Sequence, residues 1–202
     1  MLRKAIAYMP PLNEIRIHGR GGQGNVIAAY MLAQAGFEAG RFVQAFPSFG
    51  PERRGAPVAA FVRISDSPIR RRCQVREPSY LIIQDPSLLH VPGTLQGVRR
   101  GGLIIVNSSK QIEAAGIPMG VSITFVPATA IALQFLGDPI PNTALLTALL
   151  TLTNLLPLDS LERVLTQRFT GDSLDRNLRL MREVAARVSS YSQEGAGHAT
   201  GN

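Results

Sequence analysis

The sequence predicts an α/β fold: a Rossmann-like, open and mostly parallel sheet with an inserted β-hairpin and a helical C-terminal part. Three observations predict it. A glycine-rich turn joins a strand pattern to a helix pattern near the start, short apolar runs follow in the middle, and helical periodicity dominates from Pro127 onward. The 202 residues, of which 45% are hydrophobic, suffice for one domain with a sizeable core.

The first predicted unit is a strand, a glycine turn and a helix. Residues 14–18 alternate polar and apolar side chains and lead directly into the turn Gly19-Arg20-Gly21-Gly22-Gln23-Gly24. The helix should end near Gly40, and residues 41–44 then indicate a second strand. The apolar face of this helix would be formed by Val26, Ile27, Tyr30, Met31, Ala33, Gln34 and Phe37. This order places the glycine turn at the carboxyl end of the first strand.

A loop rich in proline and glycine follows. Residues 45–57 contain three prolines and two glycines, which exclude a regular helix or a central strand. Loops of this length inside a compact domain are usually functional or disordered, and its aromatic and arginine residues argue against plain disorder. Residues 58–64 and 69–75 then predict a β-hairpin across the turn Ser65-Asp66-Ser67-Pro68.

From residue 80 onward, the sequence predicts short buried strands followed by helices. Short apolar runs typical of buried parallel strands lie at residues 80–84, 103–106 and 121–126. Helices are expected over residues 128–136, 142–155, 158–168 and 173–188. We therefore divide the chain into an N-terminal extension (residues 1–12), one domain (residues 13–188) and a flexible tail (residues 189–202).

Composition argues against several kinds of chemistry. The single cysteine, Cys73, cannot form an internal disulfide or supply the four thiolates that an iron–sulfur cluster usually requires. No metal-ligand spacing occurs, and His18, His90 and His198 lack a nucleophile or carboxylate at a catalytic spacing. The apolar run at residues 144–156 is too short to span a bilayer, and the N-terminus fits a secretory signal poorly. We expect a cytoplasmic protein.

The formal net charge of +7 raises the possibility of nucleic-acid binding. Residues 41–110 hold eleven Lys or Arg against four Asp or Glu, with Arg70, Arg71 and Arg72 adjacent. Few aromatic residues interleave with them, and no DNA-binding or RNA-binding signature is present. We disfavour a nucleic-acid partner, because an acidic partner subunit or a phosphorylated cofactor explains the arginines equally well.

The glycine turn predicts an anion site but not a complete dinucleotide site. Gly19, Gly21 and Gly24 satisfy the G-x-G-x-x-G spacing between a strand and a helix. A nicotinamide or flavin site usually places an acid at the end of the second strand, where this chain has Gln44. Three interpretations remain: a self-contained NAD site, glycines that only permit close packing, or a phosphate-bearing ligand shared with a neighbouring subunit.

Several motifs resemble one family. They occur in the same order at residues 19–24, 44–57, 69–72, 77–78, 84–89 and 140–143, within a match covering roughly residues 13–187. Together they closely resemble the gamma subunit of pyruvate:ferredoxin oxidoreductase and related 2-oxoacid:acceptor oxidoreductases.

The resemblance implies a subunit of a complex that oxidatively decarboxylates a 2-oxo acid to an acyl-coenzyme A. Thiamine diphosphate, Mg and 4Fe-4S clusters would belong to the alpha, beta and ferredoxin-like delta subunits, which agrees with the single cysteine here. This chain would carry no redox cofactor and would help to bind coenzyme A and assemble the complex. The electron acceptor would be ferredoxin or an NAD-linked flavin subunit.

The resemblance and the loop chemistry together assign the candidate residues. The coenzyme A site would comprise Arg20, Gly21, Gly22, Gln23, Gly24, Asn142 and Thr143. A loop that contacts another subunit or the active site would present Phe46, Ser48, Phe49, Glu52, Arg53 and Arg54. Asn142 and Thr143 are also expected to cap the following helix.

Alternatives to this function come from other classes. A free-standing dinucleotide-dependent dehydrogenase would need a ribose-binding acid and a catalytic pair, and a structural binding module would need no small ligand at all. Within the family, the form of residues 48–55 favours a pyruvate-type enzyme. An aromatic 2-oxo acid such as phenylglyoxylate stays an alternative substrate.

Overall fold

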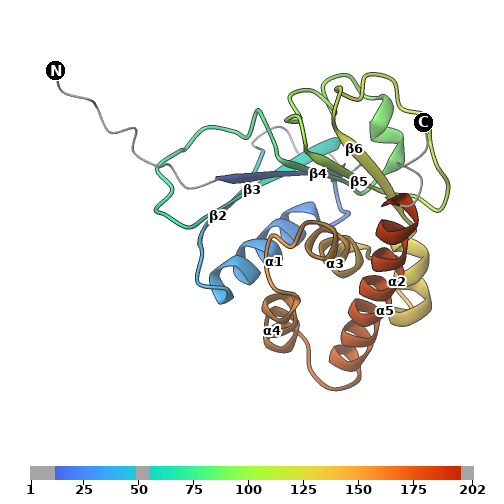
Figure 1. Ribbon diagram of the computed structural model, residues 1–202. Helices are drawn as coiled ribbons and strands as arrows, with labels where there is room; N and C mark the ends of the chain where they lie inside the picture. The colour runs from blue at the N-terminus through green and yellow to red at the C-terminus, as the bar shows by residue number, and fades with distance from the viewer. Residues whose placement is uncertain (1–11, 49–54, 197–202) are drawn as a thin grey trace.

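The structure, a computed structural model, describes residues 12–48 and 55–196 as one mixed six-stranded sheet covered by helices (Figure 1). The strand order is β2-β3-β1-β4-β5-β6. Strands β1, β4, β5 and β6 are parallel, whereas β3 is antiparallel to both of its neighbours, β1 and β2. The strands are β1 (Asn13–Arg20), β2 (Phe42–Pro47), β3 (Pro57–Ser65), β4 (Tyr80–Ile83), β5 (Leu103–Asn107) and β6 (Ser122–Val126).

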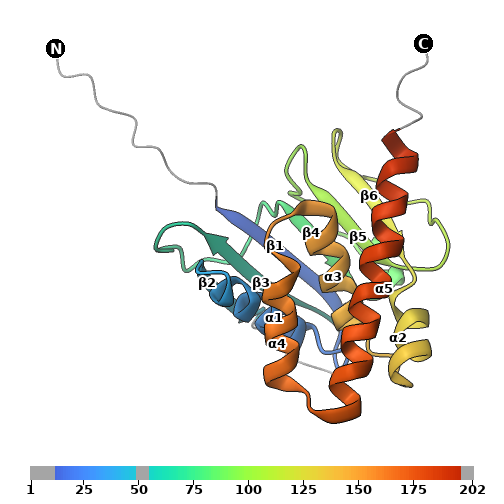
Figure 2. The same cartoon turned by 60° about the horizontal axis from the view of Figure 1, so that its bottom comes forward.

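The α-helices of the described chain lie on one side of this sheet, as Figures 1 and 2 show. They are α1 (Asn25–Glu38), α2 (Ala128–Leu136), α3 (Asn142–Thr153), α4 (Leu158–Arg168) and α5 (Gly171–Ala196). The opposite face is covered by loops and a short 3-10 helix, η1 (Pro86–His90). The predicted α/β fold, with a mostly parallel sheet and a helical C-terminal part, is confirmed.

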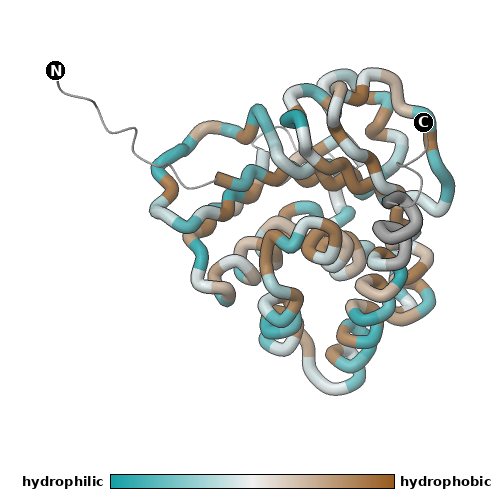
Figure 3. The backbone as a smooth tube through the Cα atoms, in the orientation of Figure 1, coloured by the Kyte–Doolittle hydropathy of each residue, from teal (hydrophilic) through white to brown (hydrophobic). Residues whose placement is uncertain are grey.

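Two apolar cores result from the two-residue period of the strands. On the helical face, Ile17, Ile82 and Ile105 pack with α1 and with α3, whose first nine residues are all buried. On the other face, the neighbouring Ile83 and Ile104 pack under η1 and the long loops. The brown band of apolar residues along the strands in Figure 3 marks the layer that both cores share.

The position of the predicted β-hairpin was wrong. Strand β3 is as expected, but it pairs with β2 and β1, and residues 69–75 form no strand. Their backbone is held by side chains instead. Gln44 donates to the carbonyl of Ile69 at 3.2 Å, and Arg63 donates to the carbonyl of Cys73 at 2.6 Å. The strand predicted at residues 41–44 corresponds to β2, which lies at the sheet edge, with β3 between it and β1.

Helix α1 buries only part of the predicted face: Met31 and Ala33 are buried, but not its other large side chains. Ile27, Tyr30 and Phe37 are exposed, at 43%, 51% and 71%, whereas the alanine-rich side faces the core. Small residues face the core because they allow the helix to approach the sheet closely. At Gly36, for example, a Cβ atom would lie 2.6 Å from Cγ1 of Val43. The aromatic side chains of the helix are left on the outer surface, whereas Met31 and Leu32 are buried.

Helix α5 continues to Ala196, beyond the predicted helix end at residue 188. Adding a residue to an existing helix is much easier than starting one, so a polar sequence without apolar periodicity can continue it. Residues 197–202, like residues 1–11 of the N-terminal extension, lie outside the described chain.

Candidate functional site

The glycine turn connects β1 to α1 at the carboxyl edge of the parallel strands. The backbone of Gly22 has a φ of 95° and that of Gly24 a φ of 78°, both in the left-handed region that favours glycine. A Cβ atom on Gly22 would meet no other atom within 4 Å, so the space beyond this residue is open. At Gly24 a Cβ atom would lie 2.9 Å from Nδ2 of Asn142. The turn is thus open at Gly22 and tightly packed at Gly24.

Arg20 fixes the turn to the next parallel strand. Its Nε donates to Oδ2 of Asp85 at 2.7 Å, one terminal nitrogen donates to the carbonyl of Gly55, and the other to Oγ of Ser87. Burial raises the pKa of Asp85, but hydrogen bonds from Ser87 and the Arg20 guanidinium outweigh it and hold this pKa below its usual value. The carboxylate is therefore ionised and paired, and the Arg20 side chain is committed to the protein.

Gln23 closes the turn upon itself. Its side-chain oxygen accepts from the backbone N–H of Arg20 at 2.7 Å, and its own N–H donates to the Arg20 carbonyl at 3.0 Å. The side chains of Arg20 and Gln23 therefore shape the loop, and its backbone remains the part that can meet a ligand.

A chain of amides joins the turn to β4 and α3. Nε2 of Gln84 donates to Oδ1 of Asn142 at 2.9 Å, and Nδ2 of Asn142 donates to the carbonyl of Gly24 at 3.3 Å. The predicted capping role was wrong: Pro141 is the N-cap of α3, and neither Asn142 nor Thr143 makes a capping bond. The Thr143 hydroxyl donates instead to Oδ1 of Asn177 at 2.9 Å.

The start of α1 offers backbone donors to an anion. The N-cap of this helix is Gly24, which has no side chain to satisfy the first-turn N–H groups. No described group accepts a hydrogen bond from the N–H groups of Gly22, Asn25 or Val26. Free N–H groups at a helix start, beside a glycine that leaves open space, suit a phosphate.

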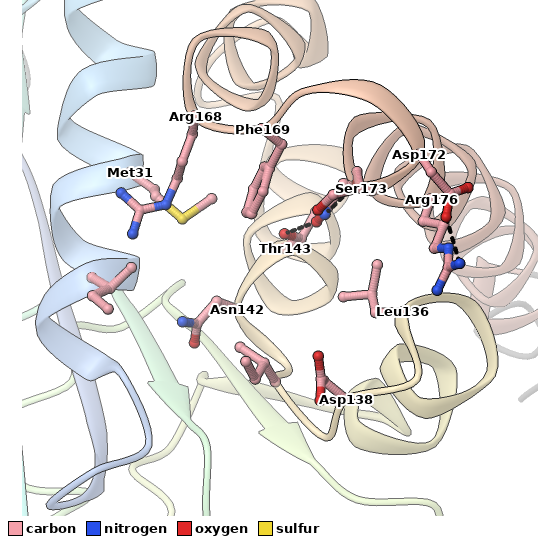
Figure 4. A pocket seen from close by; sticks show the side chains of 13 residues that line it. Met31, Leu136, Asp138, Asn142, Thr143, Arg168, Phe169, Asp172, Ser173 and Arg176 are labelled. Carbon is pink, nitrogen blue, oxygen red and sulfur yellow. Dashed lines mark hydrogen bonds and ion pairs between the residues drawn. The ribbon is translucent and has the colours of Figure 1, made fainter.

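A cavity of about 430 Å³ adjoins the turn on the helical side (Figure 4). Ile27 and Met31 of α1 line it together with Asn142, so the cavity and the turn share a wall. Its other lining residues are Leu136, Asp138, Ile140, Thr143, Arg168, Phe169, Asp172, Ser173, Arg176 and Asn177. Apolar side chains thus alternate with amides, hydroxyls and charged groups, and Arg176 is paired with Asp172.

The structure brings the predicted cofactor residues together but only partly describes the predicted interface loop. The ring of Phe46 is half-buried and packs against Phe61, with 5.2 Å between ring centroids. The half-buried Ser48 donates its backbone N–H to the carbonyl of Ala59 at 2.8 Å. Phe49, Glu52, Arg53 and Arg54 lie outside the described residues.

The predicted cofactor site omits three polar residues that build this edge, although two of them lie in the motif at residues 84–89. Gln84 and Asp85 directly follow β4, and Asn107 ends β5 and donates to the Gln84 carbonyl at 2.9 Å. Ligands of open α/β sheets bind at the carboxyl ends of the strands, where the strand order reverses. That rule points to the gap between β1 and β4, which is where these residues lie, so the polar residues after each apolar run were the available signal.

Some findings bear on the alternatives. Gln44, expected at the end of the second strand, lies in the middle of β2 and donates to the Ile69 carbonyl. Strand β2 carries no acid, and β3 separates it from β1. Within residues 12–48 and 55–196, no three His, Cys, Asp or Glu residues gather as a metal site would need. None of the described helices has both the length and the apolar character needed to cross a bilayer.

Comparison with known proteins identifies the family. The model of the pyruvate ferredoxin/flavodoxin oxidoreductase family matches residues 14–186. The chain is 44% identical over 181 residues to the pyruvate/ketoisovalerate oxidoreductases common subunit gamma of Thermococcus litoralis, covering 88% of this chain and 98% of the relative.

Solved structures show the same fold. The pyruvate oxidoreductase subunit PORC of Thermotoga maritima superposes with a TM-score of 0.77 at 37% identity, covering 87% of this chain and 96% of that one. A 2-oxoglutarate:ferredoxin oxidoreductase from Magnetococcus marinus, solved with 2-oxoglutarate, coenzyme A and succinyl-CoA bound, gives a TM-score of 0.73 at 23% identity. It covers 89% of this chain and 31% of that one. The chain belongs to the pyruvate ferredoxin/flavodoxin oxidoreductase family, as the gamma subunit of a multi-subunit 2-oxoacid ferredoxin oxidoreductase.

Proposed function

We propose that this chain holds the phosphates of coenzyme A at its glycine turn, within a complex that oxidatively decarboxylates a 2-oxo acid to an acyl-coenzyme A. One observation carries the proposal. The turn at the carboxyl end of β1 presents N–H groups, at Gly22 and the start of α1, that donate to no described group and lie next to open space. Such donors favour an anion, and the missing ribose-binding acid disfavours a self-contained NAD site.

The predicted residues take different parts in this site. The backbone at Gly22 and Gly24 would face the phosphates, because a glycine turn allows the ligand to approach closely. Gly21 would hold the turn in place, since its N–H donates to the Ala56 carbonyl at 2.9 Å. Arg20 and Gln23 would hold the turn in shape, since their side chains are bonded within the protein. They are positioning residues rather than phosphate ligands.

Asn142 and Thr143 would serve the cavity beside the turn. With about 430 Å³, the cavity is in the range of small-molecule sites and offers apolar walls with a few polar groups. Because Asn142 also contacts the Gly24 carbonyl, a ligand whose phosphates bind at the turn could extend into the cavity. Coenzyme A is a ligand of the Magnetococcus enzyme, whose likeness to this chain lies in the fold.

In the complex, the thiol of coenzyme A would accept the acyl group, and this chain would bind and orient the carrier. Thiamine diphosphate, Mg and 4Fe-4S clusters would be held by alpha, beta and delta subunits, with ferredoxin or an NAD-linked flavin subunit as acceptor. The substrate would be pyruvate, a substrate that the relatives' names also give, with phenylglyoxylate as the alternative. The cytoplasm is the expected location.

The loop from Phe46 onward would contact another subunit or the active site. Phe46 and Ser48 mark where it leaves β2, and its remaining candidates are Phe49, Glu52, Arg53 and Arg54. This assignment stays a prediction.

The glycine turn can be tested with a matched pair of variants. Gly22→Val should raise the KM for coenzyme A of the assembled complex by at least about tenfold, because distortion of the turn removes hydrogen bonds to a charged phosphate. Gly40→Val is the control: Gly40 has a φ of 74° and equally open surroundings, and it lies just before β2, at the opposite end of α1 from the turn.

The proposal requires that Gly22→Val leave the complex assembled and that Gly40→Val leave the KM unchanged. Equilibrium binding of coenzyme A to both complexes separates affinity from turnover. An unchanged affinity for coenzyme A in an intact Gly22→Val complex would overturn the proposal.

A further inference from the structure

Six arginines lie on two loops that meet at the amino end of β1: the first loop spans residues 66–79 and the second spans residues 91–102. Glu14 joins the loops: its carboxylate accepts from Arg71 of the first loop at 3.5 Å and from Arg99 of the second at 2.9 Å. The arginine surface comprises Arg70, Arg71, Arg72, Arg76, Arg99 and Arg100.

The two loops are packed tightly against each other. The backbone N–H of Arg99 donates to the carbonyl of Pro78 at 3.0 Å. At Gly97, a Cβ atom would lie only 2.2 Å from the carbonyl oxygen of Arg76. Such an approach is possible only for glycine, so the loops keep a fixed spacing.

A buried guanidinium also holds the first loop in place. Arg63 is fully buried and donates to Glu14 at 2.8 Å, to the Cys73 carbonyl at 2.6 Å and to the Arg71 carbonyl at 3.4 Å. Burying a charged pair is costly unless the geometry is good, and here it orders a segment that has no regular secondary structure. The arginines beside it are thus presented from a fixed backbone.

The arginine surface has more positive charge than its own chain neutralises. Arg70, Arg72, Arg76 and Arg100 are exposed, and no carboxylate of the described residues lies within 4 Å of them. One carboxylate, Glu14, serves Arg71, Arg99 and the buried Arg63. All six residues are arginine rather than lysine, and arginine is the cation enriched in protein interfaces, where it binds carboxylates in a bidentate manner.

We propose that the arginine surface docks an acidic face of another subunit of the same complex. Charge complementarity to carboxylates identifies the partner's chemistry, and the pinned loops reduce the ordering cost of binding. Glu14 and Arg20 lie six residues apart on β1, or about 20 Å at the usual strand rise, so this surface is separate from the glycine turn. Its role does not depend on where coenzyme A binds.

Charge reversal tests this docking surface in the co-expressed complex with this chain tagged. Arg70→Glu with Arg72→Glu changes two exposed side chains that make no bond to described groups. The partner subunits retained per tagged chain at 0.15 M salt (about 8 Å screening length) should fall by about tenfold. Arg179→Glu with Arg182→Glu is the control, since it makes the same charge change on exposed residues of α5 and should keep retention within about twofold.

Circular dichroism and the thermal midpoint establish that both variants fold. If the reversal unfolds the chain, Arg70→Gln with Arg72→Gln should still lower retention relative to the natural chain, by a smaller factor, and this difference should shrink at higher salt. Equal retention by the two charge-reversed variants would overturn the proposal. So would normal retention combined with lost binding to a 20-base DNA, because the surface would then serve a nucleic acid.

Discussion

Replacing Arg63 with methionine is expected to destabilise the chain by about 3–5 kcal/mol, the usual cost of breaking a buried ion pair by removing one partner. Arg63 is fully buried, and its Nε lies 2.8 Å from Oε1 of Glu14. The variant leaves the buried Glu14 carboxylate short of a donor and frees the carbonyl of Cys73. Urea unfolding of the purified chain measures the loss.

A surface pair provides the comparison. Arg163 is half-exposed and pairs with Glu38 at 3.4 Å, so Arg163→Met should cost under about 1 kcal/mol. Adding Glu14→Gln to Arg63→Met should cost less than the two single changes together, because both single changes break the same buried ion pair. Equal losses for Arg63→Met and Arg163→Met would contradict the role given to this pair.

Acid is expected to destabilise the chain through His18. Burial, followed by the charge of Arg16, lowers the pKa of His18 to about 4. Its unfolded pKa is about 6.5, so between pH 6.5 and pH 4 the unfolded state binds a proton that the folded state does not. Stability therefore falls as the pH falls through this window, by roughly 2–3 kcal/mol, and is unaffected by His18 above it.

Removing the titrating group should remove this dependence. His18→Gln should flatten the plot of unfolding free energy against pH between 6.5 and 4, as measured by urea unfolding at half-unit steps. The paired Asp85 has a pKa lowered from the ordinary 3.8, so its contribution is present throughout this range and is lost only at lower pH. A His18→Gln profile as steep as that of the natural chain would show that another group binds the proton.

The fold could be predicted where the pattern reports local structure. The glycine turn, the strand at Leu103–Asn107 and the helix at Leu158–Arg168 lie where periodicity and turn chemistry put them. The β-hairpin could not be predicted correctly, because the carbonyls after Ile69 are satisfied by side chains from distant strands, and no local pattern encodes such bonds. Likewise, the choice of the alanine face of α1 depends on how closely Gly36 meets Val43.

The candidate site could be predicted only in its local part. The sequence indicates the turn and its conformation, since only glycine favours the backbone at Gly22 and Gly24. It does not indicate that Gln84 and Asn142, 58 residues apart, join in one amide chain that ends on the turn. Contacts of that kind arise from strand order, which only the folded sheet sets.

The central claim is that this chain itself contacts coenzyme A. The most direct test is photocrosslinking of an azido-adenine coenzyme A to the assembled complex, followed by mass-spectrometric mapping of the labelled peptides. Our account predicts labelled peptides from this chain around the turn at Gly22 and the cavity at Asn142, with labelling suppressed by unmodified coenzyme A. Label found only on the other subunits would contradict it.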